Sequence, residues 1–309
     1  MSSSFTHKPY KTMPSYLDSS RTQILPTHLP QRHHIISSIS DRISGLTFLS
    51  RPPNNEKLIQ TRRIIVEDGE ENEKKNETWE KMREEARAEA EREPALFGYY
   101  FTSILSHDSL ESALANQLSE SAFGKAKQLL VLSENNDVVE AVNEDLKAIK
   151  SRDPACTSHV HCFLNFKGFL ACQAYRIAHK LWLQDRKSMA LLIQNRVSEV
   201  FAVDIHPGAK IGRGILFDHA TGLVVGETAV IGDNVTIFHN VTLGGTGKES
   251  GDRHPKIGDG VTIGAGTNVL GNIRVGEGAK IGAGSVVLKE VLPRSTCVGN
   301  PARLVGAGK

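Results

Sequence analysis

The chain has 309 residues, a formal net charge of +2 and 23% charged residues. This charge is too small to predict a nucleic-acid-binding or membrane-surface protein, and no run approaches the roughly 20 apolar residues that span a membrane. Four cysteines without CxxC spacing indicate free thiols in a reducing compartment rather than a disulfide framework or a zinc site: Cys156, Cys162, Cys172 and Cys297.

Residues 1–76 show no sustained periodicity. Up to Ser50 the segment is rich in Ser, Thr, Pro and His, and its acidic residues are Asp18 and Asp41. Such a composition buries too little apolar surface to offset the entropy of ordering, so a disordered leader is expected. An acid-poor, Ser-rich leader is also typical of an organelle transit peptide. We therefore expect a cytoplasmic protein, with the plastid as the alternative.

From Thr78 the pattern becomes helical, with strong helix formers and apolar residues at a spacing of about 3.6. A first helix is expected from Trp79 up to Pro94, which ends or restarts it. Further helices are predicted over 95–105, 109–118, 138–149, 165–182 and 188–200. Together they define an all-helical domain over 77–203. It is expected to cap the N-terminal end of the following domain, because open strand edges invite aggregation.

From about Asp204 to Gly306 the chain repeats every six residues. An aliphatic residue opens each hexad, as at Ile211, Val225, Ile231, Ile237, Ile257, Ile263 and Ile281. Glycine suits corners where a Cβ is costly, and 22 of the 27 glycines lie at Gly208 or later. Six residues per face and three faces per turn describe a left-handed parallel β-helix. The sequence predicts this solenoid, with a short C-terminal tail, over 204–309.

The repeat is interrupted twice. Its phase slips by two residues around His219, just after Asp218, so the His219 side chain need not follow the interior pattern. Asp204 lies fifteen positions earlier, close to one coil of eighteen residues, which would stack its carboxylate beside the imidazole. The second interruption, of eight residues within 246–256, must leave the solenoid as a loop. Long loops on regular scaffolds tend to carry function.

Several motifs occur in a fixed order along both predicted domains: Arg152-Asp-Pro-Ala, Lys167-Gly-Phe, Asp204-Ile-His-Pro, Phe217-Asp-His-Ala-Thr-Gly, Leu243-Gly-Gly-Thr-Gly-Lys and Gly251-Asp-Arg-His-Pro-Lys. With these motifs the chain resembles the serine O-acetyltransferases, and segments 160–164 and 192–199 resemble the plant members in particular. The resemblance covers residues 78–306. It implies transfer of acetyl from acetyl-CoA to the hydroxyl of L-serine, giving O-acetylserine and CoA in cysteine biosynthesis.

The proposed chemistry needs a base, because a serine hydroxyl is a weak nucleophile at neutral pH and histidine is the best-matched side chain. We expect His219 to be the general base and Asp204 its partner, and the resemblance assigns the same roles. His254 offers a further hydrogen-bond donor near the reacting oxygen, which makes it the third predicted catalytic residue.

Serine and the co-substrate are expected to bind residues of both domains. Arg253 offers a planar fork for the carboxylate, and by resemblance it binds serine while Asp153 and Asp218 hold the ammonium. The Gly245 amide is a candidate donor to the oxyanion. Acetyl-CoA is expected in a groove between solenoid edges, where small residues admit the pantetheine arm and one lysine meets the phosphates: Gly245, Thr246, Ala265, Gly266, Ala283, Gly284 and Lys280.

Plainer interpretations compete with these roles. An isolated Asp-His pair in a solenoid is more often a corner, Asp153 before a proline fits a turn cap, and Lys280 fits a solvated corner. His206 and His239 are expected to be structural, and Glu227 is left open.

A different enzyme class, carbonic anhydrase, uses this solenoid to bind zinc with histidines from neighbouring subunits. His206, His219, His239 and His254 are numerous enough. A zinc site, however, needs three ligands within about 2 Å of one ion, and the acyltransferase-like motifs fit that use poorly. We therefore expect no metal.

The resemblance also implies partners. Family members form trimers with sites between neighbouring solenoids, their helical domains pair trimers into hexamers, and L-cysteine can occupy the serine site as a feedback inhibitor. They also bind O-acetylserine sulfhydrylase through a C-terminal tail that ends in isoleucine. This sequence stops at Lys309 without that isoleucine, so activity without the complex is expected. A non-enzymatic scaffold is the remaining alternative.

Overall fold

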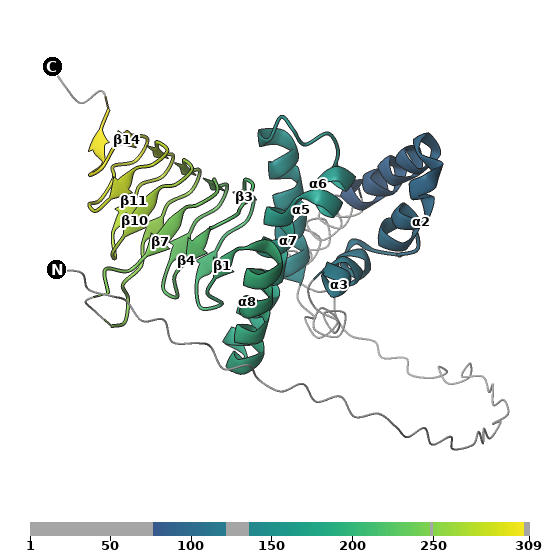
Figure 1. Ribbon diagram of the computed structural model, residues 1–309, viewed down its shortest axis with the longest axis horizontal. Coiled ribbons are helices and arrows are strands. Elements are labelled where there is room, and N and C mark those ends of the chain that lie inside the picture. The colour runs from purple at the N-terminus through teal and green to yellow at the C-terminus, as the bar shows by residue number, and fades with distance from the viewer. Residues whose placement is uncertain (1–76, 122–135, 248–249, 306–309) are drawn as a thin grey trace, which may run out of the picture. The chain divides into compact units, whose positions relative to one another are not determined.

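The computed structural model describes residues 77–121, 136–247 and 250–305. The expected leader and residues 306–309 of the expected tail lie outside the described residues. A helical domain is followed by three parallel sheets that stack coil upon coil (Figure 1). This is the predicted arrangement of an all-helical domain and a left-handed parallel β-helix, and all described residues belong to one compact unit.

The helical domain follows the predicted pattern, with two differences. Its first helix spans 77–92 and stops before Pro94, as expected. The expected helix over 95–105 is divided into a 3-10 turn, an α turn and a π turn. The expected helix over 165–182 begins only at Lys167, because Phe166 is extended (φ −87°, ψ 99°) and ends a separate helix over 159–165 that was not predicted. The helices are η1 (Pro94–Leu96), α2 (Phe97–Tyr100), η2 (Phe101–Leu105), α3 (Leu110–Ser121), α5 (Asn136–Arg152), α6 (His159–Asn165), α7 (Lys167–Leu183) and α8 (Lys187–Phe201).

Fifteen short strands form the three sheets of the solenoid among the described residues. The first sheet contains β1 (Asp204–Ile205), β4 (Val224–Val225), β7 (Thr242–Gly244), β10 (Asn268–Leu270) and β13 (Val286–Val287). The second contains β2 (Lys210–Ile211), β5 (Val230–Ile231), β8 (Lys256–Ile257) and β11 (Arg274–Val275). The third contains β3 (Leu216–Phe217), β6 (Thr236–Ile237), β9 (Thr262–Ile263), β12 (Lys280–Ile281), β14 (Thr296–Val298) and β15 (Arg303–Leu304), the last antiparallel to β14.

The strand register confirms both interruptions of the repeat. In the first sheet, Val224 pairs with Thr242 eighteen positions later, which is one regular coil. Asp204 pairs with Val224 across twenty positions, so the coil that contains His219 holds two extra residues. Thr242 pairs with Asn268 across twenty-six positions, so eight extra residues leave the solenoid in the loop before β8.

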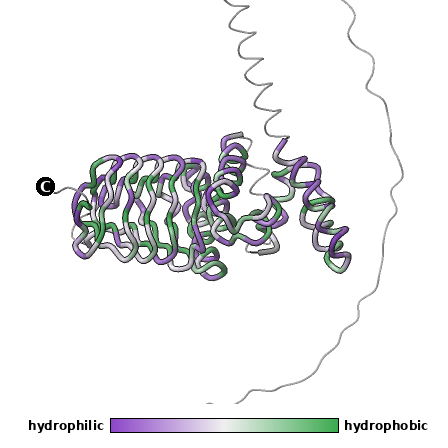
Figure 2. Tube along the Cα trace, turned by 90° about the horizontal axis from the view of Figure 1, so that it is seen from above, coloured by the Kyte–Doolittle hydropathy of each residue, from purple (hydrophilic) through white to green (hydrophobic). Residues whose placement is uncertain are grey.

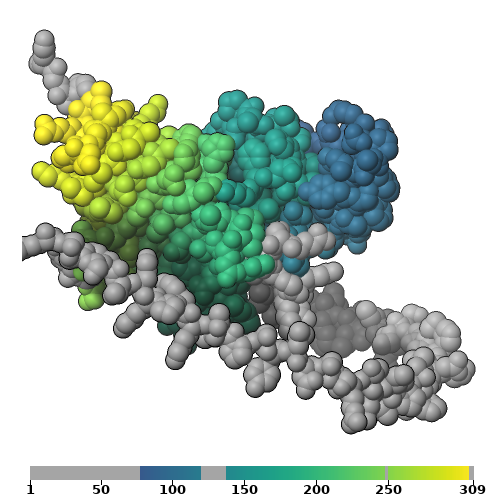
Figure 3. Space-filling view, viewed as in Figure 1, coloured from purple at the N-terminus to yellow at the C-terminus, as the bar shows by residue number. Residues whose placement is uncertain are grey.

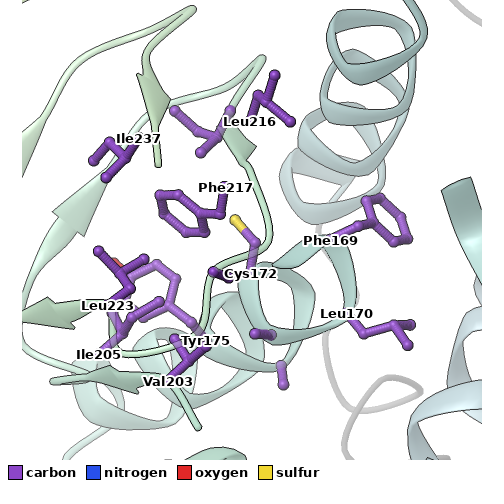
Figure 4. Packing of buried hydrophobic residues seen from close by; sticks show 14 of the residues in the cluster. Phe169, Leu170, Cys172, Tyr175, Val203, Ile205, Leu216, Phe217, Leu223 and Ile237 are labelled. Carbon is purple, nitrogen blue, oxygen red and sulfur yellow. The ribbon is translucent and has the colours of Figure 1, made fainter. Parts of the chain in front are cut away.

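The solenoid axis is aliphatic. The hexad-opening residues are buried or partly buried, and Figure 2 shows hydrophobic positions recurring from coil to coil. At the N-terminal end, α7 closes this axis: Cys172 and Tyr175 lie with Phe217 and Leu223 of the first coil in one buried cluster (Figure 4). The predicted capping role of the helical domain is therefore confirmed for the described residues.

Polar side chains of α5 and α7 satisfy the open backbone of the first coil. Tyr175 donates its hydroxyl to the Ala209 carbonyl at 2.5 Å, and Arg176 donates to the Gly212 carbonyl at 2.8 Å. Asp145, whose side chain is 1% exposed, accepts from Arg176 at 2.7 Å and from the Ile215 amide at 2.8 Å. These groups would otherwise be buried without partners, so the contacts fix how the helices sit on the first coil.

Figure 3 shows the helices and the coils adjoining on one face. None of the described helices is both long and apolar enough to cross a membrane.

Candidate active site

The corner that carries His219 has an unusual backbone. His219 and Ala220 both adopt left-handed conformations, with φ of 54° and 55°. The Ala220 amide donates to the Asp218 carbonyl at 2.6 Å, and the Thr221 amide donates to the His219 carbonyl at 2.7 Å. These two tight turns direct the imidazole outward, so that its side chain is 76% exposed, with Nε2 3.9 Å from Asp218 Oδ1. The expectation that His219 leaves the interior pattern is confirmed.

Asp153, Asp218 and His219 line one cavity of about 510 Å³ between the helical domain and the first coil. Asp153 lies just after α5, and its Oδ1 also accepts from the Ala155 amide at 2.8 Å. Asp153 therefore caps a turn, as the plainer interpretation predicts, and also lines the cavity. Asp153 and Asp218 belong to motifs 65 positions apart in the sequence. They meet at this cavity because α5 and α7 pack on the first coil.

Other residues that line this cavity had no predicted role: His161, Asn165, Lys167 and Thr221. The Lys167 ammonium donates to the Thr221 hydroxyl. Lys167 and Thr221 stand inside the quoted motifs, but their contact joins positions 54 apart. No spacing along the sequence indicates such a contact, which only the docking of α7 creates.

Asp204 lies beside the same corner. Its amide donates to the Leu223 carbonyl at 2.9 Å, and its Oδ1 accepts from Gln194 Nε2 on α8 at 2.7 Å. Among the described residues, Asp204 and His219 share no hydrogen bond. The partnership of Asp204 with His219 stays a prediction.

A row of small residues continues from His219 along the solenoid. We call this row the His219 edge, the corner between the third and first sheets formed by residues 218–223, 238–241, 264–267 and 282–285. Backbone hydrogen bonds join its successive coils, from the Gly266 amide to His239 and from the Gly284 amide to Ala265. A Cβ placed on Gly284 would meet nothing within 4 Å. Four of the residues predicted to bind acetyl-CoA therefore lie on this edge: Ala265, Gly266, Ala283 and Gly284.

Arg253 and His254 lie on a different corner. We call it the Arg253 edge, the corner between the first and second sheets formed by residues 206–209, 226–229, 245–247 and 250–255. Gly245 belongs to it, since a Cβ there would lie 3.4 Å from Arg253 Cγ, and Thr246 follows directly. The two edges are the opposite ends of one face of the solenoid, and the six residues of a face span on the order of 15 to 20 Å at about 3.3 Å per residue. A single chain thus does not bring Arg253 or His254 to His219.

Hydrogen bonds hold two of the predicted site residues of the Arg253 edge. Arg253 Nη2 donates to Glu227 Oε2 at 2.9 Å. Glu227, to which the sequence analysis assigned no role, is therefore the ion-pair partner of Arg253. His254 is buried, and its Nδ1 accepts from the Thr228 amide at 3.1 Å. The proton of a neutral imidazole therefore sits on Nε2, as a donor requires. Burial, and then the Arg253 charge, lower the pKa of His254 and favour this neutral form.

Three further positions named in the sequence analysis are Lys280, His206 and His239. Lys280 begins β12 in the third sheet and is exposed. His206 packs edge-on against Trp182 at the Arg253 edge, and His239 packs against His219 with ring centroids 5.8 Å apart. Within the described ranges, no group of three or more His, Cys, Asp or Glu side chains is arranged to hold a metal ion.

Two family models match the chain. One described as "Serine acetyltransferase, N-terminal" matches residues 78–174, and one described as "Bacterial transferase hexapeptide (six repeats)" matches residues 254–289. The chain is 55% identical over 313 residues to "Serine acetyltransferase 3, mitochondrial" of Arabidopsis thaliana, covering 95% of this chain and 78% of that protein. It is 66% identical over 239 residues to "Serine acetyltransferase 1, chloroplastic" of the same plant, covering 75% and 76%.

Solved structures show the same similarity. Soybean serine acetyltransferase complexed with serine matches with a TM-score of 0.73 and 57% identity, over 75% of this chain and 99% of that one. Serine acetyltransferase from Brucella abortus in complex with coenzyme A matches with a TM-score of 0.72 and 46% identity, over 74% and 95%.

Proposed function

The chain belongs to the serine acetyltransferase family and transfers acetyl from acetyl-CoA to L-serine, and we propose that His219 is the general base in a site built by two neighbouring chains. The observation that carries this proposal is the cavity that places His219 beside Asp153 and Asp218. It offers a base and two carboxylates in one space, as a substrate with a hydroxyl and an ammonium requires.

In the proposed reaction His219 removes the proton of the serine hydroxyl while the oxygen attacks the thioester carbonyl carbon. The tetrahedral intermediate then expels the CoA thiolate, and the imidazolium of His219 gives its proton to that thiolate. The exposed imidazole is suited to this exchange because its ring is not tied to the interior. Asp218 at the His219 edge and Asp204 in the adjoining strand β1 would stabilise the imidazolium charge, with Asp204 as the predicted partner of the base.

Asp153 and Asp218 are proposed to hold the serine ammonium, because their carboxylates line the cavity from opposite domains. Arg253 is proposed to bind the serine carboxylate and His254 to donate its Nε2–H near the reacting oxygen. Both lie on the other edge, so they must come from the neighbouring chain of a trimer. Two such trimers paired through their helical domains would give the hexamer.

The co-substrate is proposed to lie between the same two edges. Ala265, Gly266, Ala283 and Gly284 of one chain leave room for the pantetheine arm, and Lys280 meets the phosphates. Gly245 and Thr246 belong to the Arg253 edge and would come from the neighbour, where the Gly245 amide stabilises the oxyanion. L-cysteine carries the same ammonium and carboxylate as serine, so we propose that it competes for the same cavity.

Mixed trimers test the two-chain site. His219→Ala and His254→Ala chains, each nearly inactive alone, should recover about a quarter of wild-type activity when co-expressed in equal amounts, because random neighbours then complete one site in four. As a control, wild-type chains mixed equally with the double variant should also give about a quarter, whereas sites within one chain would give about half. Loss of activity in the first mixture, with trimers intact, would contradict the shared site.

Single variants test the base itself. His219→Ala should lower kcat by at least roughly a hundredfold, the low end for a general base. Serine-dependent release of CoA thiol is the assay, and a folded trimer with unchanged kcat would exclude His219 from this role.

A further inference from the structure

We propose that Lys167 is a positioning residue, which aims His219 at the serine cavity by holding Thr221 in the catalytic corner. This inference rests on the proposed role of His219 as the base. It concerns the first two residues of α7, which lie at the cavity but have no role in the chemistry described so far.

The corner needs support because its backbone is strained. His219 and Ala220 are consecutive non-glycine residues in the left-handed region. Such conformations persist only where the surrounding structure holds them, and they gather at active sites. The imidazole is largely exposed, and its ring contact among the described residues is with His239, whose ring centroid lies 5.8 Å away.

Neighbouring coils hold the two ends of the corner. At the near end, the Asp218 amide donates to the Ile237 carbonyl at 2.9 Å. The Asn240 amide donates to the Thr221 carbonyl at 2.8 Å, and the Gly222 amide donates to the Ala202 carbonyl at 2.8 Å. Both bonds act on the backbone after His219. On the side facing the cavity, the support comes from α7.

Two adjacent residues of α7 hold that side. A Cβ on Gly168 would lie 2.1 Å from the Phe217 carbonyl oxygen and 3.2 Å from Ala220 Cβ, so the helix rests directly against the corner. Lys167, half-buried, extends its ammonium to the Thr221 hydroxyl. That hydroxyl also lies 3.5 Å from the His219 carbonyl oxygen. A chain of contacts thus runs from Lys167 through Thr221 to the backbone of the base.

A lysine contact at a protein surface usually contributes little to stability. Its effect here is expected on the rate, because a displacement of about 1 Å in a reacting group can cost a hundredfold in activity. A loss of this one contact leaves the Gly168 packing in place, so we expect a partial displacement and roughly a tenfold fall in kcat.

The test compares Lys167→Met, Thr221→Val and the double variant in the full trimer, with Lys147→Met as a matched control. Lys147 is an exposed lysine on α5 that pairs with Glu144. Both single variants should lower kcat about tenfold and change KM for serine less than about twofold, and the double variant should be no slower than either single one. Lys167→Arg should restore most of the rate because it keeps a cationic donor.

Three outcomes would overturn the inference. A raised KM for serine at unchanged kcat in Lys167→Met would make Lys167 a direct ligand of the serine carboxylate. A normal rate in Thr221→Val beside a slow Lys167→Met would show that the lysine does not act through Thr221. Additive losses in the double variant would show the same. His219→Ala, measured alongside, separates the two proposals: if it stays active, the assignment of the base fails, whatever Lys167 does.

Discussion

Replacing Gly168 with alanine tests whether the packing of α7 on the first coil sets the geometry of the base. The added Cβ would lie 2.1 Å from the Phe217 carbonyl oxygen, 3.1 Å from its carbon and 3.2 Å from Ala220 Cβ. Two of these three atoms belong to the backbone, so rotation of a side chain cannot relieve the clash. Restoring a normal contact requires roughly 1 Å of movement between α7 and the corner.

The cost of this movement is expected in both stability and rate. Overpacking at a tight site lowers the free energy of unfolding by about 1 to 3 kcal/mol. A shift of about 1 Å at His219 should lower kcat by on the order of a hundredfold. Thiol release under saturating acetyl-CoA and serine measures kcat, thermal unfolding measures stability, and light scattering checks the assembly.

Gly98→Ala is the matched control. Gly98 lies in α2, and a Cβ there would meet nothing within 4 Å, so alanine should leave kcat unchanged and add about 0.5 to 1 kcal/mol of stability. If Gly168→Ala keeps both the wild-type kcat and the wild-type midpoint, the helix does not determine the position of the corner, and the reasoning fails.

Three further predictions follow from individual contacts. Asp145→Ala should lower the free energy of unfolding by about 3 to 5 kcal/mol in urea titrations, because it leaves the buried Arg176 guanidinium without its carboxylate. Gly226→Ala, whose Cβ would lie 2.0 Å from the His254 ring, should lower kcat by displacing that ring, with a smaller change in the unfolding midpoint. Burial lowers the pKa of His179 and of His254, so the unfolded chain binds more protons than the folded chain below about pH 6.5. Stability should therefore fall as the pH drops from 7.5 to 5.5, and His179→Gln should flatten that decline in a series of thermal unfolding curves.

The solenoid was predictable because the same six-residue pattern occurs many times in succession. Each hexad places an aliphatic side chain inside and a small or polar residue at a corner, and the register of the strands follows from counting. The same counting gave the two-residue slip and the eight-residue loop. Helix boundaries were less certain where one backbone angle decides them, as at Phe166, whose extended conformation separates α6 from α7.

One grouping of residues in the candidate site was predictable, but the contacts that hold the site were not. Asp153, Asp218 and His219 do share a cavity, which the order of the motifs indicated through the resemblance. The partner of Asp204 was not predictable, because Gln194 reaches it only when α8 packs on β1. Glu227 remained open for the same reason: its contact with Arg253 depends on how the loop folds back over the corner.

A regular coil and a catalytic site require different side-chain directions. A perfect hexad repeat would turn every side chain either into the axis or along a flat face, and none would stand where a base, a carboxylate and a cofactor meet. In the proposed mechanism the two departures from the repeat, one at each of two edges, supply such side chains. Because neither edge can reach the other in one chain, assembly of neighbouring solenoids is a condition of catalysis in this scheme. The helical domain contributes in a different way, by placing Asp153 in the cavity and by packing α7 against a strained corner whose ends are bonded to neighbouring coils.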